Sequence, residues 1–171
     1  MYEKIIIAGS GGQGIMFLGS IIAKCALAGG KFTTFYPSYG AEMRGGTASC
    51  SVIISDTEIG SPMINNPSIL IILNEQSYNK FSPKLKPGGR MFLNSSLIND
   101  AESAGIPVPA TETATELGDV RAANLVMLGK FVSVTKLFPA ETVNRVIRDC
   151  FSAKKGLLDI NLNAFLKGTE L

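Results

Sequence analysis

Lys4-Ile-Ile-Ile-Ala8 is followed directly by Gly9-Ser10-Gly11-Gly12-Gln13-Gly14, and an apolar segment then begins at Ile15. The β-branched run predicts a short strand, and the apolar residues at every third or fourth position over 15–25 predict a helix. Glycines let the backbone adopt angles that are closed to other residues, and they let main-chain N–H groups approach a ligand. Because these N–H groups lie at the positive end of the helix, the loop is a candidate anion site.

The glycine spacing fits the dinucleotide fingerprint G-x-G-x-x-G. That fingerprint also requires an acidic residue about 20 residues further on, which holds a ribose hydroxyl. Here that place is Thr34-Phe35-Tyr36, and no carboxylate occurs between Lys4 and Ala41. The loop is therefore interpreted as a site for phosphate or another anion, or as a tight turn that binds nothing, rather than as an ordinary NAD pocket.

The composition limits the chemistry available to the chain. Its 171 residues fit one domain, and 46% hydrophobic against 18% charged residues indicate a folded core with a rather apolar exterior, which favours protein partners. The net charge is +2 without a basic cluster, so the footprint expected for nucleic-acid binding is lacking. The chain has no histidine, which excludes a Ser-His-Asp or Cys-His mechanism within it.

The three cysteines, Cys25, Cys50 and Cys150, are far apart and form no C-x-x-C motif. An iron–sulfur or zinc site made by this chain alone is therefore not expected. Their apolar neighbours favour buried free thiols, which are typical of a reducing, cytoplasmic setting. No apolar run approaches the roughly 20 residues that span a bilayer, so a membrane location is not expected.

Strands and helices are predicted to alternate along the chain. Strands are expected over residues 4–8, 31–36, 47–55, 68–73 and 90–93, with a short edge strand over 106–109. Helices are expected from 15, after Asn74, over 120–135, from Pro139, and in a short final segment near 162–166. This order predicts a single α/β domain over 1–171, a Rossmann-like, doubly wound, mainly parallel sheet with helices on both faces and a helical C-terminal third.

Four segments together resemble the gamma subunit of 2-oxoacid:ferredoxin oxidoreductases, and the resemblance covers nearly the whole chain. The segment Tyr39-Gly-Ala-Glu-Met-Arg-Gly-Gly46 resembles the 2-oxoglutarate and branched-chain branch of this family more than its pyruvate or indolepyruvate branches. The four segments are Gly9-Ser-Gly-Gly-Gln-Gly14, Pro37-Ser-Tyr-Gly-Ala-Glu-Met-Arg-Gly-Gly46, Ala122-Ala-Asn-Leu-Val-Met-Leu-Gly129 and Asn161-Leu-Asn-Ala-Phe165.

The resemblance implies a role in a multisubunit enzyme that decarboxylates a 2-oxoacid, transfers the acyl unit to coenzyme A and passes electrons to ferredoxin. It implies alpha and beta subunits, and a delta ferredoxin-like subunit, as partners. Thiamine diphosphate, magnesium and iron–sulfur clusters are then expected in those partners, and the isolated chain is expected to be inactive. This chain would supply architecture and anion contacts near the coenzyme A route.

The candidate residues fall in two loops, which we expect to face one cleft at the carboxyl ends of the strands. Arg44 is a candidate ligand for phosphate or a substrate carboxylate, and the alternatives are an ion pair with Glu42 or a contact to a partner. Gln13 either orients a ligand or braces its loop, and Asn124 either bonds to the glycine loop or is a satisfied core amide. The candidates for ligand or anion binding are Gly9, Gly11, Gly12, Gln13, Gly14, Arg44, Gly45 and Gly46, and those for a partner interface or stacking are Tyr39, Glu42 and Met43.

Two other functional classes stay open from the sequence. One is a stand-alone nucleotide- or flavin-binding Rossmann module, which would retain its ligand as an isolated chain. The other is a purely structural subunit whose glycine loops serve packing, so that loop mutants would lose assembly before turnover.

Overall fold

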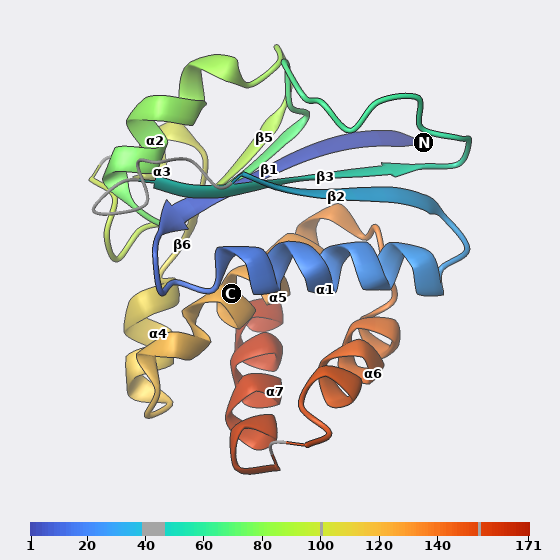
Figure 1. The fold of residues 1–171 in the computed structure, drawn as a ribbon. Coiled ribbons are helices and arrows are strands. Elements are labelled where there is room, and N and C mark those ends of the chain that lie inside the picture. The colour runs from blue at the N-terminus through green and yellow to red at the C-terminus, as the bar shows by residue number, and fades with distance from the viewer. Residues whose placement is uncertain (39–46, 100, 154) are drawn as a thin grey trace.

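A computed structural model describes residues 1–38, 47–99, 101–153 and 155–171. Figure 1 shows a sheet with helices on either side of it. The strands are β1 (Tyr2–Ser10), β2 (Phe32–Ser38), β3 (Thr47–Ser55), β4 (Ile69–Ile72), β5 (Arg90–Asn94) and β6 (Ile106–Val108). The helices are α1 (Ile15–Ala28), α2 (Glu75–Phe81), α3 (Ala101–Ala104), α4 (Ala110–Glu116), α5 (Ala123–Thr135), α6 (Ala140–Cys150) and α7 (Lys155–Glu170), with 3-10 turns η2 (Ser82–Lys84) and η3 (Val120–Ala122).

The six strands form one mixed sheet in the order β2-β3-β1-β4-β5-β6. The pairs β1–β4, β4–β5 and β5–β6 are parallel, whereas β3 is antiparallel to both of its neighbours, β1 and β2. Residues 39–46 connect β2 to β3, and this connection is shorter than the dozen or so residues that a parallel crossover needs. Strand β3 therefore runs antiparallel to β2. The predicted α/β fold with a mainly parallel sheet is confirmed.

The alternation of side chains along β1 divides the core into two layers. Ile5 and Ile7 point into a large layer with α1, α4, α5, α6 and α7, and Ile6 and Ala8 point into a smaller one with α2 and α3. Figure 1 shows the same division, with α1 and the C-terminal helices on one face of the sheet. Helices cover both faces, as predicted, but unequally.

The C-terminal third is held to the rest of the core by a close crossing of α5 and α7. A Cβ atom on Gly129 would lie 2.2 Å from the backbone oxygen of Phe165, and one on Gly168 would lie 2.1 Å from that of Val126. The two glycines therefore let the helix backbones approach each other. The predicted helical C-terminal third is confirmed, and its last helix is 16 residues long rather than short.

Some local predictions were wrong in detail. The predicted helix over 120–135 begins with the 3-10 turn η3, so the α-helical part starts at Ala123. Helix α4 was not predicted, because its Thr-rich sequence has weak helix propensity. Cys25 and Cys50 are buried as expected, but Cys150 is partly exposed. Within the described ranges, no helix combines the length and the apolar character needed to cross a membrane.

Candidate functional site

The glycine loop, residues 9–14, joins β1 to α1 at the carboxyl edge of the sheet (Figure 1). Gly12 and Gly14 have φ angles of 88° and 72°, a region that residues with a Cβ rarely adopt. Gly14 is the N-cap of α1, no side chain caps that helix, and its first turn holds no acidic residue. The predicted strand, turn and helix are present, and the helix end offers N–H groups without a competing carboxylate.

Gln13 braces this loop from inside. Its Oε1 atom accepts a hydrogen bond of 2.7 Å from the backbone N–H of Ser10, and its Nε2 atom donates to the Leu73 carbonyl at 3.4 Å. A Cβ atom on Gly9 would lie 2.6 Å from that Oε1 atom, so the glycine makes room for the brace. Both ends of the Gln13 amide thus have partners inside the protein, and ligand contact by Gln13 stays a prediction.

Two asparagines hold the glycine loop from other elements. Asn124 of α5 donates from Nδ2 to the Gly14 carbonyl oxygen at 3.3 Å, so of the two alternatives for Asn124 the bond to the glycine loop is the one present. Asn74, which had been expected only to start a helix, donates from Nδ2 to Ser10 Oγ while its Oδ1 caps α2 by accepting from the Ser77 N–H at 2.9 Å. The glycine loop is therefore fastened to one helix on each face of the sheet.

A hollow of about 360 Å³ lies beside the glycine loop. Ser10 pairs with Thr47 of β3, and Lys80 of α2 donates to Thr47 Oγ1 at 3.2 Å, which brings a positive charge to this edge of the sheet. Sequence reasoning missed Lys80, because only the folded chain brings α2 next to the start of β3. The hollow is lined by Ser10, Gly11, Gly12, Gly14, Ile15, Met16, Phe17 and Ala48.

The second predicted loop, residues 39–46, lies outside the described residues, and so do Tyr39, Glu42, Met43, Arg44, Gly45 and Gly46. Its two flanks are described. Ser38 ends β2 and pairs with Ser49, while Thr47 begins β3 and pairs with Ser10. Both flanks therefore lie at the same edge of the sheet as the glycine loop, and a cleft shared by the two loops stays a prediction.

The side chains do not fit an iron–sulfur cluster, which thiolate ligands hold. Burial raises the pKa of the Cys25 and Cys50 thiols to about 12, so both are protonated at neutral pH. Cys25 lies in α1, Cys50 in β3, and Cys150 at the end of α6. Among the residues that the structure describes, no three His, Cys, Asp or Glu side chains are grouped so that they could hold a metal ion.

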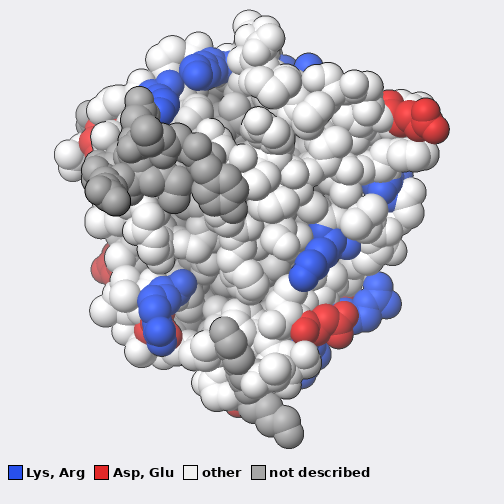
Figure 2. All heavy atoms as spheres, viewed as in Figure 1, with Lys and Arg blue, Asp and Glu red and all other residues white. Residues whose placement is uncertain are grey.

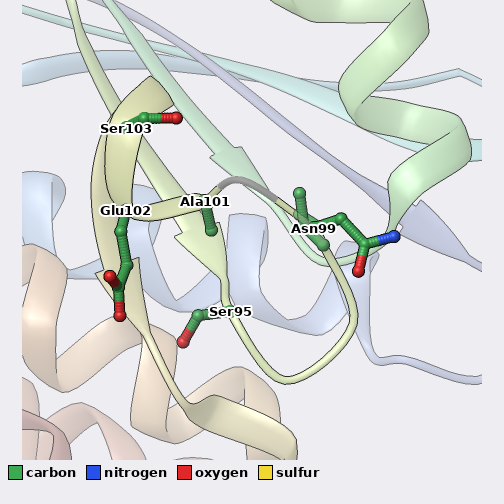
Figure 3. A pocket seen from close by; sticks show the side chains of 6 residues that line it. Ser95, Asn99, Ala101, Glu102 and Ser103 are labelled. Carbon is green, nitrogen blue, oxygen red and sulfur yellow. The ribbon is translucent and has the colours of Figure 1, made fainter.

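A second hollow, of about 450 Å³, opens where the chain leaves β5. Figure 3 shows Ser95 and Glu102 on one side of it, while the amide of Asn99 points away from them. This hollow shares no residue with the one beside the glycine loop. In Figure 2, charged side chains are scattered over the visible face, and its centre is largely uncharged.

Comparison with known proteins identifies the family. The family model described as "Pyruvate ferredoxin/flavodoxin oxidoreductase" matches residues 4–171. The chain belongs to this family. This chain is also similar to a solved structure, the gamma subunit of a keto/oxoacid ferredoxin oxidoreductase from Geobacter sulfurreducens. The two align over 98% of this chain and 96% of the solved chain, with a TM-score of 0.83 and 29% identity. The resemblance to gamma subunits is therefore confirmed.

Curated relatives match this chain over very different shares of their own length. The 2-oxoglutarate synthase subunit KorC of Methanocaldococcus jannaschii is 34% identical, over all of this chain and 94% of its own length. The ketoisovalerate oxidoreductase subunit VorA of Methanothermobacter thermautotrophicus is 36% identical over 98% of this chain, which spans only 36% of that longer relative.

A solved 2-oxoglutarate:ferredoxin oxidoreductase chain from Magnetococcus marinus is likewise longer than this chain. The alignment covers 99% of this chain and 30% of the length of the solved chain, with a TM-score of 0.87 and 26% identity. That protein was solved with 2-oxoglutarate, coenzyme A and succinyl-CoA bound.

Proposed function

We propose that this chain is the gamma subunit of a cytoplasmic 2-oxoacid:ferredoxin oxidoreductase. In the proposed reaction a 2-oxoacid loses carbon dioxide, its acyl group passes to the thiol of coenzyme A, and the electrons pass to ferredoxin. The partners are alpha and beta subunits, together with a delta ferredoxin-like subunit. Family membership over residues 4–171 supports this assignment.

The proposed substrate is 2-oxoglutarate or a branched-chain 2-oxoacid. This choice is supported by two relatives, a 2-oxoglutarate synthase subunit at 34% identity and a ketoisovalerate oxidoreductase subunit at 36% identity. The proposed role of this chain is scaffold and anion contact, because it has no histidine and its buried thiols are protonated. Thiamine diphosphate, magnesium and iron–sulfur clusters then belong to the companions.

The observation that carries the anion-binding role is the uncapped start of α1, with Gly12 and Gly14 in left-handed geometry beside a hollow. Main-chain N–H groups there suit a phosphate of coenzyme A. Helix-end electrostatics contribute about 0.3–1 kcal/mol, whereas micromolar binding needs about 8 kcal/mol. The glycine loop therefore needs further contacts, and Arg44, Gly45 and Gly46 from the second loop are the proposed additions.

The test compares two glycines that both have open space for a side chain. A Cβ atom on Gly11 or on Gly60 would meet nothing within 4 Å, but only Gly11 lines the hollow beside the glycine loop. We expect Gly11→Val to raise the KM for coenzyme A about tenfold in the assembled complex, since a lost contact of about 1.4 kcal/mol is a factor of ten. Gly60→Val should leave this KM unchanged.

The assay is 2-oxoacid-dependent reduction of ferredoxin by the complex co-purified with this chain. An unchanged KM for coenzyme A in Gly11→Val removes the glycine loop from coenzyme A binding. Loss of assembly in Gly11→Val with turnover of the residual complex intact favours the purely structural role. Calorimetry of the isolated chain with NAD, FMN and coenzyme A checks the remaining class, because tight binding of any of them indicates a stand-alone module.

A further inference from the structure

Strand β2 ends the sheet on one side, and its outer edge has no strand partner among the described residues. Its seven residues, Phe32–Ser38, include no charged side chain. Natural proteins protect such edges with charged residues, with prolines or by keeping the edge strand short, because unpaired N–H and C=O groups can pair with another chain. The strand at the opposite end, β6, is three residues long and contains Pro107, so that edge is protected.

The outer edge of β2 also carries aromatic side chains. Phe32, Phe35 and Tyr36 are 46%, 37% and 47% exposed, and aromatic residues are enriched at protein interfaces. Phe35 points towards α1, since its ring lies 2.8 Å from the position of a Cβ atom on Gly19. Phe32 and Tyr36 point to the opposite face, because side chains alternate along a strand. Both faces of the edge therefore offer aromatic surface to a neighbour.

The order of residues in β2 is self-complementary. Antiparallel pairing of two copies about Thr34 places Phe32 of each copy opposite Tyr36 of the other. It also places Thr33 opposite Phe35, and the two Thr34 residues meet on the two-fold axis. Aromatic pairs, pairs of an aromatic with a β-branched residue, and threonine pairs all stabilise antiparallel strands. A two-fold dimer needs such a patch, because the same surface of both copies forms the interface.

Neither proline nor charge interferes with this register. Pro37, which has no N–H to donate, lies beyond the paired residues 32–36 and faces Lys31 of the other copy. Lys31 is the nearest charged residue in the sequence, and within its own chain its Nζ atom donates to Asp56 Oδ1 at 2.5 Å. Like charges directly opposite each other destabilise a pair of strands, and none meet in this register.

The helices leave room for the second copy. At Gly19, α1 lies over both β3 and β2, because a Cβ atom there would meet Cys50 Sγ and the Phe35 ring. If two β2 strands pair, the α1 helices of the two copies are separated by roughly 10–14 Å, or two to three strand spacings. Packed helices need about 8–10 Å between their axes. The two α1 helices therefore do not clash at this point.

We propose that two copies of this chain pair through the outer edge of β2, antiparallel and centred on Thr34, so that one sheet continues through both copies. The pairing does not depend on which reaction the chain serves. Two stretches of residues 32–36 make a small interface, so the expected dimer is weak, with a dissociation constant in the micromolar range. A strand from a companion subunit is the competing occupant of this edge.

The test places charges at position 34, where a residue meets its own copy only in the proposed register. Sedimentation equilibrium of the full chain at about 100 μM should show mainly dimers for the wild type. Thr34→Lys and Thr34→Glu should each weaken dimerisation at least about tenfold, because like charges then meet on the two-fold axis. An equimolar mixture of the two variants should restore it. Thr142→Lys and Thr142→Glu, at a partly buried threonine on α6, are the matched controls that should dimerise as the wild type does.

A disulfide cross-link provides a second test if a charge at position 34 unfolds the chain. Opposite residues of antiparallel strands have Cα atoms about 4.5–5.5 Å apart, a distance that a disulfide spans. In a Cys150→Ser background, which removes the partly exposed native thiol, Thr34→Cys should link two copies under mild oxidation. This should hold for the chain alone and for the complex co-purified with it, whereas Thr142→Cys should form no such link.

Three results would each overturn the pairing. The first is a wild type that is monomeric at about 100 μM. The second is a mixture of Thr34→Lys and Thr34→Glu that dimerises no better than either variant alone. The third is a Thr34→Cys chain that cross-links only to a companion subunit, which assigns the β2 edge to that companion.

Discussion

The side-chain nitrogen of Asn124 lies 2.2 Å from the position that a Cβ atom on residue 14 would occupy. Gly14 is thus required twice, once by its φ of 72° and once by an amide that arrives from 110 residues further along the chain. The hydrogen bond at 3.3 Å ties the first turn of α1 to α5. The shape of the candidate anion site therefore depends on the packing of the C-terminal helices.

Replacing Gly14 with Ala should destabilise the protein strongly. The new Cβ would be strained at positive φ and would displace the Asn124 amide, which together should lower the free energy of unfolding by about 2–4 kcal/mol. Gly11→Ala is the control, because a Cβ there meets nothing within 4 Å, and it should change stability by less than about 0.5 kcal/mol. Urea unfolding of both variants measures the difference, and equal midpoints would contradict this account.

The crossing of α5 and α7 should tolerate no side chain at its closest point. Gly168→Ala would place a Cβ atom 2.1 Å from the Val126 backbone oxygen, so the helices must separate, at a cost of at least about 2 kcal/mol. Gly156→Ala, on the same helix but in open space, should instead raise stability by up to about 1 kcal/mol. Thermal melts measure both variants, and a melting temperature of Gly168→Ala at or above that of the wild type is the contrary result.

The three thiols should react with iodoacetamide in a fixed order. Burial raises the pKa of Cys25 and Cys50 to about 12, which leaves about one thiolate in ten thousand at pH 8. Cys150 is partly exposed and should be modified first, whereas all three should react in denaturant. Mass spectrometry of peptides after timed labelling measures the order, and labelling of Cys50 ahead of Cys150 in the folded protein would refute it.

Asp56 should make the folded state sensitive to acid. Hydrogen bonds from Lys31 and then from the N-terminal amine lower the pKa of the Asp56 carboxyl to about 2. The pKa of this carboxyl is lower in the folded protein than in the unfolded protein, where it is about 3.9. The ionised carboxylate therefore stabilises the fold fully above the unfolded pKa, and this stabilisation is lost as the pH falls towards 2. The effect is small and weakened by salt, because the pair is exposed.

The measurement compares unfolding midpoints at pH 5 and pH 2.5. Asp56→Asn should be less sensitive to this change than the wild type, since the variant has no carboxyl to protonate there. Asp159→Asn, an exposed position on α7, is the matched control. A wild type and Asp56→Asn that lose the same stability on acidification would show that the ion pair contributes nothing.

Much of the fold could be predicted, because its signals are local. A β-branched run, a glycine loop and an apolar period of three to four residues determine β1, the turn and α1 from neighbouring residues alone. Pro107 marked β6 as an edge strand, since it cannot donate a ladder hydrogen bond. Helix α4 was missed because burial of Ala110 and Ala114 against the core, rather than its own propensity, stabilises it.

The candidate site likewise has one part that the local sequence determines and another that only tertiary contacts determine. The candidate anion-binding turn follows from glycine spacing, since backbone angles and helix ends are properties of consecutive residues. The supports of that turn come from distant elements: Asn74 reaches it from the start of α2 and Asn124 from α5, while Lys80 of α2 binds Thr47 beside it. Contacts between residues far apart in the chain depend on strand order and helix crossings, and a periodic pattern in one segment carries no information about its neighbours in space.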